Sequence, residues 1–183
     1  MLGKRNYIRN RELDCRLPQG MLNGQGLGAL SQFRYGLFSF GWCGCEIIAA
    51  YNLLQMAGRP EPLSAIAREI YRYGHVLLGF FGTNVYVMPY FLKQHGVRAS
   101  TVYRKRDFLD APGDFGVVSF WTKPKRVLTS SVHTVAYRTH ADGGVTVFNR
   151  YNSHNYAHEY ASMREAFGKY PFITASICTE KKA

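Results

Sequence analysis

Apolar residues return at helical spacing soon after Cys43. Four of them fall at i, i+3, i+4 and i+7, the spacing that lines one face of a helix: Ile47, Ala50, Tyr51 and Leu54. Gly58 and Pro60 follow, and a glycine with a proline close behind it typically ends a helix. The pattern therefore predicts a helix over residues 43–57, with a Cys-Gly-Cys motif at its start.

Two further helices are predicted before the strands begin. The first covers roughly residues 64–74. The second begins near Thr83 or Asn84, either of which can cap it. Pro89 lies well inside this second run, and an interior proline removes a helical hydrogen bond. The second helix is therefore expected to be short or kinked, or to start nearer Met88.

After residue 96 the pattern changes to short segments rich in valine, threonine and aromatic residues, which are typical of strands. These segments cover residues 97–104, 115–121, 132–138, 144–149 and 172–178. Helices followed by strands predict an α+β fold, with the helices packed on an antiparallel sheet. Residues 1–40, which hold Gly-rich turns, are expected to form an irregular N-terminal lead-in, and residues 41–183 a single domain.

The composition fits one globular domain with a real core. The chain has 183 residues, of which 46% are apolar. It contains no stretch of about 18 uninterrupted apolar residues, so no membrane span is predicted. The N-terminus is basic but lacks the apolar region of a signal peptide, so the cytoplasm is the expected compartment. The net charge of +11 suggests an anionic partner: nucleic acid, a membrane surface or an acidic peptide. Nucleic acid is a less favoured partner, because only charge and scattered aromatic residues support it.

Cys43 and Cys45, two of the four cysteines, stand at the predicted helix start. A thiol is nucleophilic as its thiolate, and the unpaired N–H groups of a helix N-terminus lower a thiol pKa. Gly44 lets the backbone turn tightly and leaves room for a substrate carbonyl. The position suits an acyl-transfer nucleophile, and a buried structural cysteine is the alternative. The spacing of the four cysteines does not match a zinc site, so neither a metal nor another cofactor is expected.

His133 is the histidine best placed to act as a general base. It opens the predicted strand at 132–138 among apolar neighbours, whereas the others are predicted near helix ends, turns or loops. His154 and His158 have the i, i+4 spacing of metal ligands on a helix, but no third ligand is obvious. An imidazole beside a thiol can take its proton and later protonate the leaving group.

The hairpin after His133 predicts which residue orients the imidazole. A three-residue loop at 141–143 with Gly143 in the left-handed conformation would be a type I turn with a G1 bulge. That register places Asn149 on the same face as His133, within reach of a ring nitrogen. A two-residue Asp-Gly turn would shift the register by one and present Asn152 instead.

The segment CGCEIIAAYNLLQMAGRPEPLSAIAREI resembles the start of papain-like cysteine peptidases of the bacteriocin-processing (double-glycine leader) group. Members of that group carry a cysteine followed by glycine, an apolar helix, a glycine-proline break and a second helix. The likeness continues through GTNVYVMPYFLKQHGV. It also covers VHTVAYRTHADGGVTVFNRYN, where the family has its catalytic histidine and then an Asp or Asn that begins a turn. The resemblance spans about residues 41–155 and implies the papain-like fold.

By this resemblance Cys43 matches the nucleophile, His133 the base and Asn149 the residue that orients the base. Cys45 is the alternative nucleophile, and it lies about 200° round the helix from Cys43. The family usually carries a glutamine shortly before the cysteine, which serves the oxyanion hole together with a backbone N–H. Gln32 is the nearest candidate for that role.

The expected function is therefore that of a papain-like cysteine peptidase or amide hydrolase that acts through a Cys–His–Asn triad and an acyl-enzyme. An acyltransferase on the same triad and a non-catalytic peptide-binding module of the same fold are the alternatives. The substrate would be a peptide or another acyl or amide compound, and the basic charge favours an acidic peptide. The oligomeric state is left open.

Overall fold

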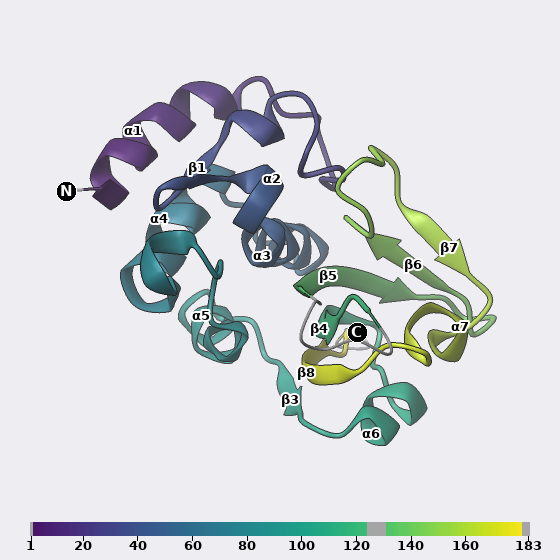
Figure 1. Cartoon of the computed structure of the whole chain (residues 1–183). Helices are drawn as coiled ribbons and strands as arrows, with labels where there is room; N and C mark the ends of the chain where they lie inside the picture. Colours follow the sequence, from purple (N-terminus) through teal and green to yellow (C-terminus); the bar gives the residue numbers. More distant parts are fainter. Residues whose placement is uncertain (1, 124–130, 181–183) are drawn as a thin grey trace.

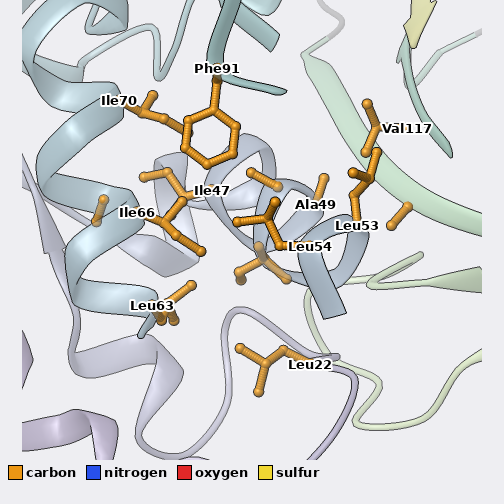
Figure 2. Close-up of a cluster of buried hydrophobic side chains, with 14 of the residues drawn as sticks. Leu22, Ile47, Ala49, Leu53, Leu54, Leu63, Ile66, Ile70, Phe91 and Val117 are labelled. Carbon is orange, nitrogen blue, oxygen red and sulfur yellow. The ribbon is translucent and has the colours of Figure 1, made fainter. Parts of the chain in front are cut away.

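The apolar run after Cys43 forms α3 (Cys45–Met56), the central helix of the computed structural model, which describes residues 2–123 and 131–180. α4 (Leu63–Gly74) packs against α3 on the side away from the main sheet (Figure 1). Figure 2 shows side chains of α3 reaching toward α4 on one side and toward the sheet on the other. Because α3 is covered on both sides, apolar residues occupy most of its circumference and not a single stripe.

The predicted C-terminal end of the first helix is confirmed, but its predicted start at Cys43 is wrong, because Cys43 ends a separate short helix, α2 (Phe40–Cys43). Gly58 has a φ of +66°, the left-handed conformation that commonly follows a helix. The last predicted helix starts late, as α5 (Met88–Gln94), so Pro89 falls in its first turn, where the missing N–H costs little. A 3-10 turn, η3 (Val85–Val87), precedes it, and the Asn84 side chain caps this turn by accepting from the Tyr86 N–H.

The N-terminal lead-in is not irregular throughout, which corrects the expectation for residues 1–40. Residues Leu2–Asp14 form α1, which packs on α4. Polar contacts hold it: Asn6 donates to Gly36 O at 2.7 Å, and Asn10 donates to Arg34 O at 2.8 Å. The sequence pattern missed this helix because tertiary hydrogen bonds and close packing, and not a periodic apolar face, stabilise it.

Short elements complete the helical side and the connections. The remaining helices are α2 (Phe40–Cys43), η1 (Leu30–Gln32), η2 (Leu77–Gly79), α6 (Lys105–Asp110) and α7 (Met163–Phe167). A two-stranded hairpin joins β1 (Arg34–Tyr35) to β2 (Phe38–Ser39) just before α2. None of these elements is long enough to give a clear periodic signal in the sequence.

The main sheet has six strands, and every neighbouring pair in it is antiparallel, as predicted. In spatial order the strands are β3 (Ser100–Val102), β8 (Phe172–Cys178), β4 (Phe115–Trp121), β5 (Val132–Thr139), β6 (Val145–Phe148) and β7 (His158–Tyr160). Five of the six were expected from the sequence, and β7 was not. The fold is thus α+β, with helices packed on an antiparallel sheet.

The two faces of the sheet bury different cores. Val117 of β4 and Ala136 of β5 face α3 and join its core, whereas Val118 and Val135 join a second core on the opposite face, with α6 and α7. This division follows the strand alternation, since successive side chains point to opposite faces. Any residue of β5 can therefore be assigned a face by counting from Ala136.

The β5–β6 hairpin has the predicted three-residue loop. Gly143 has a φ of +87°, and His140 N–H bonds Gly144 O at 2.9 Å. The ladder runs as expected as far as the pair Ala136–Phe148. It ends there because Asn149 adopts a φ of +56°, a left-handed conformation that turns the chain out of the strand.

Candidate functional site

Cys43 lies at the end of α2 and points into the helical core. It is 4% exposed, and its Sγ donates to Ser39 O at 3.3 Å. Burial, and to a lesser extent the neighbouring Cys45, raises the pKa of the Cys43 thiol to about 12. This sulfur is therefore enclosed and protonated at neutral pH.

Cys45 is the first residue of α3 and is only partly buried. Gly44 separates α2 from α3, and a side chain there would collide with Phe40, since an added Cβ would lie 2.6 Å from that ring. No side chain caps α3, so its first N–H groups remain available to a thiol. Burial raises the pKa of Cys45 to about 11, whereas backbone N–H groups of Thr134 and of Glu46 lower it in part.

The contact between Cys45 and Thr134 arises where a strand ladder stops. Alternate residues of this hairpin direct their N–H groups across to the β6 side, as His140 does to Gly144 O. Thr134 has the same parity as His140 but lies beyond the last β5–β6 pair, Ala136–Phe148. Its N–H therefore lies outside that ladder, and it is one of the groups that lower the pKa of the Cys45 thiol in part. The thiol thus sits between a helix start and the open end of β5.

His133, the preceding residue, is 8% exposed and hydrogen-bonded to the backbone of Asn149. Its Nε2 lies 2.8 Å from Asn149 O. A carbonyl oxygen only accepts, so Nε2 carries the proton and Nδ1 keeps the lone pair of a base. Burial lowers the pKa of His133 to about 4, so the ring is neutral at pH 7.

The imidazole and the thiols are not joined in this structure. Within residues 2–123 and 131–180, no hydrogen bond links His133 to Cys43 or to Cys45. Counting from Ala136 places His133 on the face of the second core, and its ring meets the Phe120 ring edge-on at 6.0 Å. Cys45 thus lies on the α3 side of β5, near Thr134, whereas the His133 side chain projects from the opposite face of the same strand.

Asn149 holds the site together through its side chain. It is fully buried, its Oδ1 accepts from Gln25 N–H at 3.2 Å, and its Nδ2 donates to Gln25 Oε1 at 2.9 Å. The predicted partnership of Asn149 with His133 exists, but through the backbone carbonyl and not the side-chain amide. The reason is the turn at Asn149, which ends β6 and directs the amide to the N-terminal segment.

Gln25 is the residue that the sequence did not single out. Its side chain, 2% exposed, also donates to Phe40 O at 3.0 Å, so it connects Asn149 to the segment that leads into Cys45. The available signal was a polar residue inside the Gly-rich stretch between Gly24 and Gly26. Gln32, taken from its closeness in sequence, lies exposed in η1.

Asn152, the alternative orienting residue, is exposed and supports the same region from outside. Its Nδ2 donates to Gly41 O at 3.1 Å, and Gly26 N–H bonds its carbonyl at 2.9 Å. It therefore ties the loop after β6 to the segments around Gln25 and α2. The three-residue hairpin loop accounts for this outer placement, since a two-residue loop would have been needed to bring Asn152 into the strand register.

Glu46 is a buried acid beside the thiol. The side chain is 2% exposed and lies between α3 and the sheet, near the Thr134 hydroxyl, which is itself 2.9 Å from Ser119 Oγ. Burial raises the pKa of Glu46 to about 8, partly offset by the Thr134 hydroxyl. The carboxyl group is therefore largely protonated at pH 7, and it adds little charge against a nearby thiolate.

The shifted pKa of Glu46 predicts a pH dependence of stability. Above about pH 4.5 the unfolded chain releases this proton and the folded chain keeps it, so the free energy of unfolding falls as pH rises toward 8. Replacing Glu46 with glutamine should remove a slope of about 1.4 kcal/mol per pH unit between pH 5 and 8. Urea unfolding of both proteins at several pH values measures it. His133 titrates in both wild type and Glu46→Gln, so the difference between their pH slopes isolates the effect of Glu46. A Glu159→Gln control, at an exposed position, should leave the slope unchanged.

Neither comparison with known proteins identifies a relative: the chain matches no protein-family model and no curated protein sequence. In the described part of the chain, no group of three or more His, Cys, Asp or Glu side chains is arranged to hold a metal ion. None of the described helices has the length and apolar character needed to cross a membrane. The site is thus defined by its own geometry: a partly buried cysteine at a helix start, a buried neutral imidazole, and an Asn–Gln pair.

Proposed function

We propose that the protein is a papain-like thiol enzyme that transfers acyl groups from peptide or other amide substrates, with Cys45 as the nucleophile. The observation that carries the proposal is the position of the Cys45 sulfur. It lies at the uncapped start of α3, against the N–H of the residue that follows His133. Cys43, the nucleophile that the resemblance favoured, is enclosed by Ser39 and the helical core.

The chemistry assigns one role to each group. The Cys45 sulfur attacks the substrate carbonyl carbon while Nδ1 of His133 takes the thiol proton. The N–H groups of Thr134 and of the first turn of α3 are donors for the oxyanion. The C–N bond breaks, the imidazolium protonates the leaving amine, and an acyl-enzyme remains. Water then releases the acid, or an amine takes the acyl group.

The proposal requires a local movement at the start of β5. His133 lies on the face of β5 opposite to Cys45, so the backbone of this strand end must turn for the ring to reach the thiol when substrate binds. Residues 132–135 lie beyond the β5–β6 ladder, which leaves this end of the strand paired only with β4. Asn149 O fixes the tautomer that the base needs before the movement.

A non-catalytic peptide-binding module is the second candidate, and the resting site favours it in one respect. Burial raises the pKa of both thiols and lowers that of His133. A thiol and an imidazole in these states do not form an ion pair on their own. The two candidates differ in whether bound substrate is acylated onto the protein.

Turnover of an activated ester separates the two candidates. With p-nitrophenyl hippurate, the enzyme should give a burst of nitrophenolate followed by steady turnover, which is the signature of an acyl-enzyme. His133→Gln should lower the turnover about 100-fold, since general acid–base catalysis contributes that much or more. Turnover no faster than that of free cysteine, with no effect of His133→Gln, would contradict the enzyme and favour the non-catalytic peptide-binding module.

A further inference from the structure

The segment between α4 and η3, together with Trp42 of α2, exposes large apolar side chains. In that segment Leu77 and Phe81 are 68% and 66% exposed, and Trp42 is 64% exposed. Together with four neighbours they form a surface that we call the apolar tip: Leu37, Phe38, Trp42, Leu77, Leu78, Phe80 and Phe81. Single exposed apolar residues are ordinary, but a contiguous group of this kind marks an interaction surface.

The apolar tip is contiguous across three segments of the chain. The Phe80 ring contacts Phe38 at 5.5 Å and Phe81 at 4.9 Å, and Trp42 lies 6.4 Å from both Phe38 and Phe80. Leu37 N–H bonds Leu78 O at 3.0 Å, which fixes the β1–β2 turn to this segment. The surface is therefore built into the fold, and it is not the edge of a loose loop.

The backbone beneath the tip is hydrogen-bonded internally. Val76 N–H bonds Gly82 O at 3.0 Å, and the carbonyls of Val76, Leu77 and Gly79 accept from N–H groups within the same loop. Phe80 O accepts from Trp42 Nε1 at 2.9 Å. Paired carbonyls and a paired indole N–H can leave water at little cost, which is what entry into an apolar environment demands.

The two leucines occupy backbone positions that do not suit them. Leu77 and Leu78 have φ values of +44° and +55°, a region that glycine and asparagine tolerate far better than leucine. Their side chains project into solvent, so packing does not explain the choice. A residue type that costs folding energy and contributes nothing to the core is retained for contact with something outside the molecule.

The charge around the tip selects an anionic surface. Residues 32–44 and 75–87, which build it, contain no Asp or Glu, and the chain carries +11 overall. α1, which Asn6 ties to Gly36 beside the tip, presents Lys4, Arg5 and Arg9 as exposed residues. Apolar and aromatic residues flanked by basic ones are typical of proteins that lie on anionic membranes.

We propose that the apolar tip inserts into the interfacial region of an anionic lipid bilayer. A hydrocarbon partner fits better than a protein, because specific peptide recognition uses well-placed free polar groups. At this tip the carbonyls of Leu77, Gly79 and Phe80 and the Trp42 indole N–H are already paired within the molecule. Trp42, with its apolar ring outward, has the amphipathic character of residues at membrane interfaces. The proposal is independent of the thiol chemistry.

Binding to lipid vesicles tests the proposal with the full chain. The chain should cosediment with phosphatidylcholine–phosphatidylglycerol vesicles (3:1). Its binding to vesicles of phosphatidylcholine alone should be about tenfold weaker. Leu77→Asn/Leu78→Asn should reduce binding at least tenfold, since two inserted leucines are lost. The same variant should fold at least as stably as wild type, because asparagine suits both φ values. Tyr156→Asn, at an exposed aromatic on another loop, should bind as wild type does.

Fluorescence identifies the part that enters the lipid. The chain has two tryptophans, so in a Trp121→Phe protein Trp42 is the sole emitter, and its emission should shift to shorter wavelength on addition of the anionic vesicles. The proposal fails if no vesicle binds, or if the double asparagine variant binds as wild type does. It also fails if sedimentation velocity finds instead that the tip pairs two copies of the chain, a dimer that the asparagine variant abolishes.

Discussion

Replacing Cys45 with alanine is expected to lower the rate of ester turnover at least about 1000-fold, because the atom that forms the acyl bond is removed. Replacing Cys43 with alanine is expected to leave the rate within about threefold. The Cys43 sulfur donates to Ser39 O and is buried in the helical core, so its loss is expected to affect packing only. Steady-state kinetics with p-nitrophenyl hippurate measures both variants.

Each cysteine serves as the other's control in this comparison. The two variants remove the same atom from positions separated by one residue, one at the end of α2 and the other at the start of α3. A Cys15→Ser background should be used, since Cys15 is exposed and an exposed thiol can react with activated esters without an active site. The reverse result, activity lost with Cys43 and kept with Cys45, would restore the assignment that the family resemblance favoured.

Asn149→Ala is expected to lower the free energy of unfolding by about 3–5 kcal/mol. The substitution leaves the buried Gln25 side chain without its Asn149 partner and places a Cβ-only side chain at a φ of +56°. The buried Gln25 Oε1 and the Gln25 N–H then stay desolvated without their hydrogen bonds to Asn149, whereas the bond from the Gln25 side chain to Phe40 O is kept. Urea unfolding monitored by circular dichroism gives the value.

Two matched variants divide the Asn149 effect into its parts. Asn149→Gly removes the same hydrogen bonds but tolerates the left-handed backbone, so it should cost about 1 kcal/mol less than alanine. Asn152→Ala, at an exposed site with one hydrogen bond to Gly41 O, should cost no more than about 1 kcal/mol. Equal losses at positions 149 and 152 would show that the buried Asn–Gln pair does not stabilise this region.

The sequence predicted those parts of the fold that depend on local chemistry. The helix over α3, the left-handed Gly58, the late start of α5 at Met88 and the three-residue loop before Gly144 follow from periodicity, capping and turn chemistry. α1 was missed because its stabilisation comes from Asn6 and Asn10, whose partners lie in β1 and its turn. Such contacts between distant segments leave no periodic signal.

The sequence predicted which residues lie near the candidate site better than it predicted how they are arranged. The hairpin register correctly brought Asn149 near His133, but it could not predict that Asn149 leaves the strand and offers its carbonyl instead of its amide. The Cys-Gly-Cys motif was expected to place two thiols on one helix, whereas Cys43 ends α2 and Cys45 begins α3. Which side meets β5 depends on how α3 packs on the sheet, and on this point the structure favours Cys45.

Locating the acyl group on the protein shows whether Cys45 is the nucleophile. The Cys15→Ser protein would be mixed with p-nitrophenyl hippurate, quenched in acid during the burst, digested and mapped by mass spectrometry. If Cys45 is the nucleophile, one hydroxylamine-labile acyl group will be found on the Cys45 thiol, and none on Cys43 or Cys178. An acyl group on Cys43, or a native protein that carries none at all, would contradict that assignment.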